Sequence, residues 1–286
     1  MQLNCTVQVS DIDVNRIRSI PHFQASIYRD LEIGSTLDFF TRRYVRPLAE
    51  HLKISDSVVV DCASGYGWFS FAYLLAGGKK AIAVDLDAER LLAAEEIAKI
   101  LSVDDRMVFI NSEIQKIPLA SNEADIFVSI ETLEHIGRTN IMTTLSRIKD
   151  IAAKGVIITT PNKLFPVIAH DTCLPLIHWL PTKRRRRYAR LFGREELDEG
   201  NEFLTPLDLN ILRDKFKPVS ACLTFRTFED YRNHFPFYQP YGANESERPQ
   251  VRPAATKAIY YKVASRVFGA NSYWVMPSLA RVFIRR

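Results

Sequence analysis

The sequence predicts an α/β protein with a Rossmann-like, doubly wound and mostly parallel sheet that carries helices on both faces. From residue 57 onwards, short runs rich in β-branched residues alternate with segments of helical length. The runs are almost continuously apolar, as expected for strands buried on both faces, and the intervening segments are long enough for crossover helices. Hydrophobic residues make up 47% of the 286 residues and charged residues 25%, which allows a sizeable core.

The alternation predicts the order of the elements. Strands are expected over residues 57–61, 81–85, 107–111, 124–130 and 155–161. Helices are expected between them, over residues 69–78, 88–101 and 140–153. A further helix over residues 205–216, with Thr205 as its cap, leads to a strand over 218–226, and residues 277–286 form a last strand.

One domain accounts for most of the chain. Residues 1–56 are expected to form a helical preface that ends in the amphipathic run 35–52, and residues 57–286 form the domain itself. Two segments interrupt its regular alternation. They are a proline- and aromatic-rich insertion over 163–203, placed to act as a lid, and a basic, aromatic-rich excursion over 228–276.

Cysteine spacing, hydropathy and charge indicate where in the cell the protein is expected. The four cysteines form no C-x-x-C pair, and no apolar span approaches the length of a membrane helix, so we expect a cytoplasmic protein. The formal net charge is +5, and residues 227–286 alone carry nine Lys and Arg against four Asp and Glu. As an alternative to a purely cytoplasmic location, the basic insertion or the basic C-terminal region could bring the protein into peripheral contact with a membrane surface.

Polar and glycine residues gather where the first three strands end. Asp61 ends the first strand, and the turn after it contains Ala63, Ser64, Gly65 and Gly67. Glycine in such a turn lets main-chain N–H groups approach a ligand closely, so we expect both glycines to serve a ligand more than the fold.

The second and third strands add two more acids. Asp85 ends the second strand, where its carboxylate can accept hydrogen bonds from both ribose hydroxyls of an adenosyl ligand, and Leu86 follows it. Asp87 is expected to cap the next helix. Glu113 and Ile114 follow the third strand, where Glu113 can accept from an adenine amino group.

The order of these elements resembles the class I S-adenosylmethionine-dependent methyltransferases over roughly residues 40 to 225. That family reads D-x-G-x-G-x-G at the first turn, and this chain has Asp61-x-Ala63-x-Gly65-x-Gly67. The resemblance implies S-adenosylmethionine as cofactor, with residues 63–67 at its methionine part, Asp85 at the ribose, and Glu113 with Ile114 at the adenine. Asp61 would also repel the pyrophosphate of a nicotinamide cofactor.

A second motif follows the fourth strand. Glu131-Thr-Leu-Glu134-His135, with Pro161-Asn162 after the next strand, resembles the ubiquinone-pathway O-methyltransferases and, more distantly, enzymes that methylate the ribose of small RNAs. We place Glu131 with the cofactor site and expect no metal. The alternative, implied by the RNA enzymes, is a metal held by Glu131, Glu134 and His135 with a downstream histidine, His170 or His178.

The same segment supplies the catalytic candidates, His135 and Glu134. Transfer of a methyl group to a hydroxyl requires a base, and His135 is the first candidate because a histidine pKa lies near ~6.5. A structural role for this histidine stays open. Glu134 is expected to shape the acceptor pocket.

The insertion carries a basic run, 183–187, inside an expected helix. We favour a small-molecule or lipid-linked acceptor over nucleic acid, because no recognisable RNA-binding module accompanies the run. The sequence therefore predicts a methyltransferase that modifies a hydroxyl of a small metabolite, sugar or lipid-linked glycan. Two alternatives remain, an RNA methyltransferase and a module that binds S-adenosylmethionine without catalysis.

Overall fold

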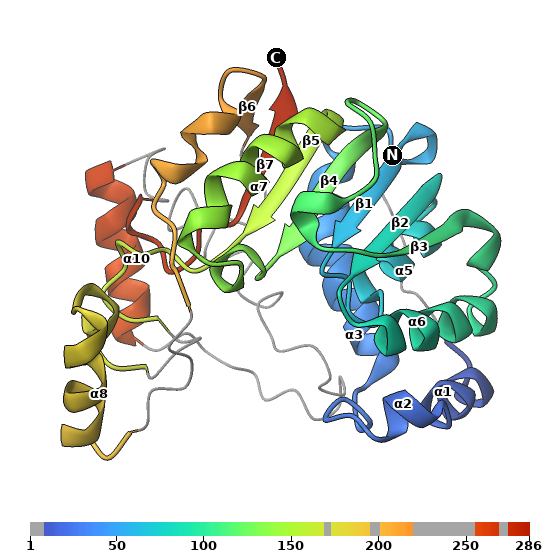
Figure 1. The fold of residues 1–286 in the computed structure, drawn as a ribbon, viewed down its shortest axis with the longest axis horizontal. Helices are drawn as coiled ribbons and strands as arrows, with labels where there is room; N and C mark the ends of the chain where they lie inside the picture. Colours follow the sequence, from blue (N-terminus) through green and yellow to red (C-terminus); the bar gives the residue numbers. More distant parts are fainter. Residues whose placement is uncertain (1–8, 169–172, 195–200, 220–254, 269–273) are drawn as a thin grey trace.

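A computed structural model describes residues 9–168, 173–194, 201–219, 255–268 and 274–286 (Figure 1). Within these ranges seven strands form one sheet in the order β3-β2-β1-β4-β5-β7-β6. Neighbours from β3 to β5 pair in parallel, whereas β7 runs antiparallel to both β5 and β6. The predicted fold class is confirmed. The strands are β1 Val58–Cys62, β2 Lys80–Asp85, β3 Met107–Asn111, β4 Ala124–Ile130, β5 Ala152–Thr159, β6 Phe216–Val219 and β7 Arg281–Arg285.

Helices lie on both faces of the sheet (Figure 1). Period-two alternation in the strands explains the two cores: fully buried Val59 packs with α5 and α6, while its neighbour Val60 packs with α7. Burial of each such side chain contributes about 1.5–3 kcal/mol. The longer helices after β1 are α5 Trp68–Leu75, α6 Ala88–Ile100, α7 Arg138–Ile151, α8 Thr182–Leu191 and α10 Ala255–Phe268.

The residues before β1 fold as short helices, and one of them reaches the turn after β1. They are α1 Asp11–Arg18, α2 Pro21–Gln24, α3 Ile33–Phe40 and α4 Arg46–Ala49, with a π-helical segment Thr41–Val45 between the last two. Phe23 of α2 lies edge-on to Tyr66 and Trp68, with ring centroids 5.1 and 5.9 Å apart. The first helices therefore help to close one side of the β1–α5 turn.

The prediction of a helix over residues 205–216 is wrong. Only a short 3-10 segment, Asp208–Leu212, forms there. Thr205 does not cap it by accepting a hydrogen bond, because its backbone N–H and hydroxyl both donate to the Asp208 carboxylate at 2.7 and 2.8 Å. The connection over residues 205–215 is fixed at both ends, by the bridge between Asn162 and Leu204 and by the pairing of Phe216 in β6.

The remaining predicted strands are found. The last one is confirmed as β7, and β6 begins two residues before the predicted strand 218–226, whose residues 220–226 lie outside the described ranges. The described residues contain no helix whose length and hydropathy would suit it to crossing a membrane.

Replacing Tyr73 with phenylalanine tests how α5 is held against the residues before β1. The fully buried Tyr73 hydroxyl lies 3.0 Å from the Ile54 carbonyl oxygen and 2.7 Å from that of Ser57. Tyr73→Phe removes this donor, so we expect the free energy of unfolding in urea to fall by about 1–3 kcal/mol. Tyr188→Phe, on a half-buried ring of α8, is the control and should change it by less than about 0.5 kcal/mol. Equal values for Tyr73→Phe and the parent would contradict the assignment.

Candidate active site

The strand order reverses between β1 and β4, and the candidate site lies at this point. From β1 the chain continues outward to β2 and β3, whereas β4 leads to β5 on the other side. In doubly wound sheets, ligands bind beyond the carboxyl ends of the strands where the order reverses. The acids predicted from the strand ends therefore meet at one edge of the sheet.

The turn between β1 and α5 is built from left-handed backbone. Ala63, Gly65 and Gly67 have φ values of 57°, 55° and 83°. Left-handed geometry costs a non-glycine residue about 1–2 kcal/mol, so the alanine at position 63 is a strained substitute for the family's glycine. The Ser64 N–H donates to the Val84 carbonyl oxygen at 3.1 Å, which ties the turn to β2.

The two glycines of this turn have different roles. A Cβ atom at Gly67 would lie 3.1 Å from the Phe71 ring, within the protein's own core, and Gly67 caps α5. A Cβ atom at Gly65 would have no atom within 4 Å. The fold therefore constrains Gly67 through its contact with Phe71, and the expectation that both glycines serve the ligand more than the fold stays a prediction.

Asp85 connects the turns after β1 and β2. One carboxylate oxygen accepts from the Gly65 N–H at 2.7 Å and the other from the Asp87 N–H at 2.9 Å. Each oxygen retains a second lone-pair direction, so the carboxylate is oriented and can still accept from ribose hydroxyls. Leu86 beside it is 70% exposed, although it is a large apolar side chain. Asp87 caps α6 as predicted, accepting from the N–H groups of Glu89 and Arg90.

Asp61 lies beneath the turn. Its side chain is buried and accepts a hydrogen bond from the Ser70 hydroxyl of α5 at 2.8 Å. Burial raises the pKa of Asp61 to about 7, while the Ser70 hydrogen bonds oppose this rise. In this structure Asp61 joins β1 to α5, and its contacts are with the fold.

Glu113 and Ile114, the residues predicted to contact the adenine, follow the end of β3. The Glu113 carboxylate lies 2.7 Å from the Lys116 ammonium and is about half exposed. Ile114 is buried among the side chains that pack below β2 and β4. A ligand amino group would therefore compete with Lys116 for the Glu113 carboxylate.

The residues of these turns suit an adenosyl ligand with an amino-acid part. The Ser64 hydroxyl is buried and has no hydrogen-bond partner. The space over Gly65 is open, the Asp85 carboxylate is already oriented, and Leu86 presents an apolar side chain. Together these features supply a polar donor, a carboxylate for ribose and an apolar surface for a purine.

A pair of carboxyl groups follows β4. Glu131 has a left-handed φ of 48°, and its N–H donates to the Thr159 carbonyl oxygen at 2.8 Å. Glu134 is fully buried; one carboxyl oxygen accepts from the Thr160 hydroxyl at 2.9 Å, and the other has no partner. Burial, and then the charge of Glu131, raises the pKa of Glu134 from 4.5 to about 8. The unfolded carboxyl ionises near pH 4.5 and the buried one near pH 8, so the free energy of unfolding falls as the pH rises from 4.5 to about 8.

The histidines predicted from the sequence differ in their burial. His135 is exposed, and His178 is buried 3.1 Å from the Lys163 carbonyl oxygen, with its ring against Phe203. His170 lies outside the described residues. Among the residues that the structure describes, no three His, Cys, Asp or Glu side chains are grouped to hold a metal ion, so Glu131, Glu134 and His135 do not form the alternative metal site there.

The end of the insertion pairs with the backbone at Glu134 and Lys163. The Glu202 N–H donates to the Glu134 carbonyl oxygen, and the Lys163 N–H donates to that of Leu204, both at 2.8 Å. Asn201 is 4% exposed, and neither atom of its carboxamide has a hydrogen-bond partner. Sequence reasoning missed Asn201, because it follows an irregular, charged stretch with no strand or motif to place it.

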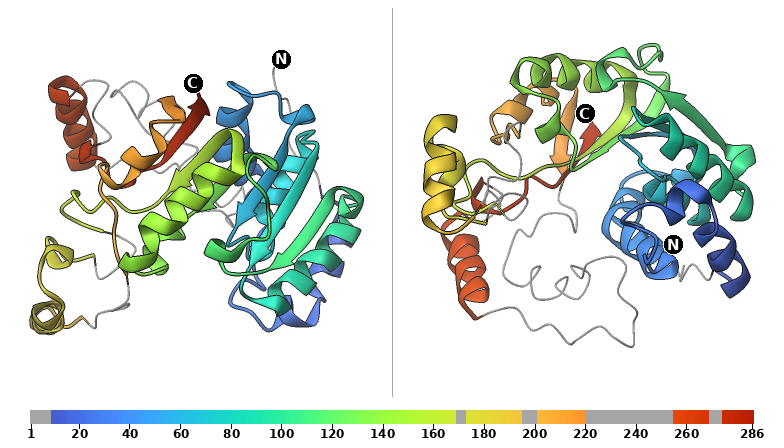
Figure 2. Two further views of the ribbon diagram at one scale, coloured as in Figure 1. Left: turned by 45° about the horizontal axis from the view of Figure 1, so that its top comes forward. Right: turned by 60° about the horizontal axis from the view of Figure 1, so that its bottom comes forward.

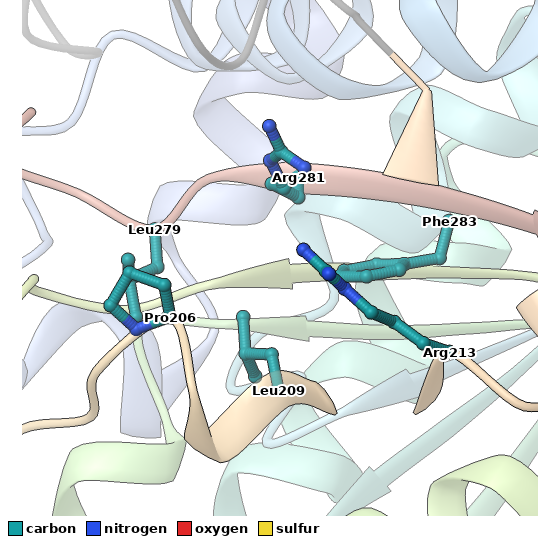
Figure 3. Close-up of a pocket in the computed structure, with 6 residues that line it drawn as sticks. All are labelled: Pro206, Leu209, Arg213, Leu279, Arg281 and Phe283. Atoms are coloured by element: carbon teal, nitrogen blue, oxygen red, sulfur yellow. The ribbon is translucent and has the colours of Figure 1, made fainter. Parts of the chain in front are cut away.

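A separate hollow lies beyond this site. It is lined by apolar side chains together with the side chains of Arg213 and Arg281 (Figure 3). None of the residues predicted for the cofactor or the acceptor belongs to it. Its lining residues are Pro206, Leu209, Arg213, Leu279, Arg281 and Phe283.

The family comparison covers the part of the chain that forms the cofactor turns. Residues 59–155 match the family model described as a methyltransferase domain. This segment, about a third of the chain, is similar to a methyltransferase domain. The match confirms the predicted family over this segment and supports the predicted enzyme class and its cofactor, S-adenosylmethionine.

Individual relatives are more distant. The ribosomal protein L11 methyltransferase of Glaesserella parasuis is 36% identical over 58 residues, which span 20% of this chain and 20% of that protein. The MccD protein is 12% identical, with a TM-score of 0.47 over 88% of this chain and 96% of that one. Magnesium protoporphyrin IX methyltransferase from Synechocystis is 14% identical, with a TM-score of 0.47 over 73% of this chain and 85% of that one.

Substitution of the two glycines separates the ligand role from the fold role. Gly65→Ala adds a methyl group in open space at a cost of about 1 kcal/mol for the left-handed backbone, so we expect a cooperative melt and weaker S-adenosylmethionine binding. Gly67→Val crowds Phe71 and should lower the melting temperature more. Calorimetry and thermal melts measure both. A parental melting temperature for Gly67→Val would refute the fold role.

Asp85 and Asp87 form a matched pair for the ribose assignment. Asp85→Ala removes a charged acceptor, so we expect S-adenosylmethionine affinity, measured by titration calorimetry, to fall by at least about tenfold. Asp87→Ala removes the cap of α6 and the half-exposed ion pair with Arg90, and should cost about 1 kcal/mol of stability with unchanged affinity. Equal affinity in Asp85→Ala and the parent would exclude Asp85 from the ribose site.

Proposed function

We propose that this chain is an S-adenosylmethionine-dependent methyltransferase that methylates a hydroxyl group of a small metabolite, sugar or lipid-linked glycan. The observation that supports the hydroxyl acceptor is the carboxyl pair Glu131 and Glu134 at the end of β4, across the order reversal from the cofactor turns. A hydroxyl must lose its proton as it gains the methyl group, and we assign this proton to the pair.

The chain's own residues have three tasks in this reaction. When bound, S-adenosylmethionine supplies the methyl group as an electrophile, so the protein aligns the acceptor, excludes water and removes a proton. We assign proton removal to the carboxyl pair in place of His135. Glu134 is buried and holds an unpartnered oxygen, whereas the His135 side chain is exposed. The acceptor oxygen would bond to the methyl carbon as the bond between that carbon and the cofactor's sulfur breaks, which leaves the sulfur as a neutral thioether, and the acceptor's proton would pass to the pair.

Asn201 supports a polar acceptor. Leaving a buried amide without hydrogen bonds costs about 1–3 kcal/mol, so a site that keeps one is expected to satisfy it with a ligand. The Asn201 carboxamide offers both a donor and an acceptor, and Asn201 directly precedes the residue that bonds to the Glu134 backbone. A sugar or polyol provides hydroxyl groups that can satisfy both atoms. We therefore assign acceptor recognition to Asn201.

The pH dependence of methyl transfer tests the proposal. Labelled S-adenosylmethionine is incubated with hydroxylated metabolites, sugars, lipid-linked glycans and, in a separate arm, RNA. A carboxyl base must be ionised, and the pKa of Glu134 is raised to about 8, so kcat/KM should rise with pH up to about 8. Glu134→Gln should lower kcat by at least about 100-fold and remove that rise, with cofactor affinity unchanged.

His135→Asn is the matched control, because it changes the neighbouring candidate base. We expect its pH profile and kcat to stay close to those of the parent. The reverse result, with the rise lost in His135→Asn and kept in Glu134→Gln, would reject the carboxyl pair as base. Labelling of RNA alone, or cofactor binding without transfer to any acceptor, would reject the hydroxyl methyltransferase itself.

A further inference from the structure

The helix α8 carries a dense positive charge. Its sequence, TKRRRRYARL, contains six Lys and Arg and no acid. Arg185 is part of the fold, since its guanidinium donates to the carbonyl oxygens of His178 and Leu180 at 3.0 and 2.9 Å. The other basic side chains of the helix are exposed, namely Lys183, Arg184, Arg186, Arg187 and Arg190.

The helix α10 combines an apolar stripe with positive charge. Ile259, Val263 and Val267 recur every four residues along it and are 62%, 54% and 67% exposed. A four-residue spacing places them on one side of the helix. The exposed Lys262 and Arg266 adjoin this stripe, and the sequence of α10 contains no acid. Such a side of a helix is amphipathic and lacks cover among the described residues.

Both helices lie at the same end of the molecule, opposite α1 and α6 (Figures 1 and 2). The start of the insertion connects to α10 through the rings of Phe165 and Tyr260, whose centroids are 5.6 Å apart. Large apolar side chains are also exposed at the end of α8 and beside it: Leu191, its last residue, is 76% exposed, Phe192 57% and Trp179 50%. We call the exposed side chains of α8 and α10, with Trp179 and Phe192, the basic–apolar end.

We propose that the basic–apolar end binds the surface of an anionic membrane. Exposed aliphatic and aromatic side chains enter the boundary between headgroups and acyl chains, while the arginines meet lipid phosphates. Charge complementarity selects an anionic surface. An RNA would account for the arginines but not for the row Ile259, Val263 and Val267, which has no counterpart in a phosphate backbone. This binding does not depend on which acceptor the domain methylates.

Vesicle flotation tests the proposal with the full chain. We expect binding to phosphatidylcholine vesicles that contain about one-third phosphatidylglycerol, and little binding to phosphatidylcholine alone. Arg184→Glu with Arg187→Glu, and separately Val263→Asp, should each weaken binding by about tenfold or more. Matched controls at the other end of the molecule are Lys79→Glu with Lys80→Glu, and Leu92→Asp on the 62% exposed Leu92 of α6. These should bind within about twofold of the parent.

Thermal melts of each variant establish that it is folded. Equal binding to neutral and anionic vesicles, or equal weakening by the control substitutions, would overturn the assignment of this end. A single-stranded RNA provides the competing result. If the chain bound this RNA more tightly than anionic vesicles, and Val263→Asp left the RNA affinity unchanged, the apolar stripe would have no part in binding and the membrane assignment would be overturned.

Discussion

The carboxylate of Asp85 determines how the cofactor half of the site is arranged. It accepts from the Gly65 N–H on one side and from the Asp87 N–H on the other, so a single side chain fixes two turns that come from different strands. Asn111 adds a second connection, because its amide donates to the carbonyl oxygens of Asp85 and Leu86. The open space over Gly65 and the exposed Leu86 belong to the two turns that this carboxylate joins.

Local chemistry explains which parts of this arrangement could be predicted from the sequence. Buried parallel strands appear as continuous apolar runs, and an acid before a helix is a recognisable cap, so the strand ends, Asp85 and the cap Asp87 could all be placed. The separate roles of Gly65 and Gly67 could not, because the difference is a contact with Phe71 that only the folded turn creates. Asn201 is also beyond sequence reasoning, since its position depends on backbone pairing of its neighbours with Glu134 and Lys163.

The helix expected over residues 205–216 shows that a local sequence pattern can also predict an element that the fold does not form. Its apolar spacing suits a helix, but tertiary structure overrides that preference, because Leu204 is bridged to Asn162 and Phe216 must pair with Arg285 in the sheet. Helix propensity is worth only tenths of a kcal/mol per residue. The pairing of both ends of this connection therefore outweighs the local preference, and the chain adopts the shorter 3-10 segment.

The position of β7 has a consequence for how the protein is made. This strand enters antiparallel between β5 and β6, yet β6 ends at Val219 and β7 begins only at Arg281. During translation, β5 and β6 therefore emerge from the ribosome long before the strand that joins them. Contacts between residues so distant in sequence form slowly, and an unpaired β5 presents an open edge in the meantime. Closure of the sheet by β7 is therefore expected to be a late step in folding.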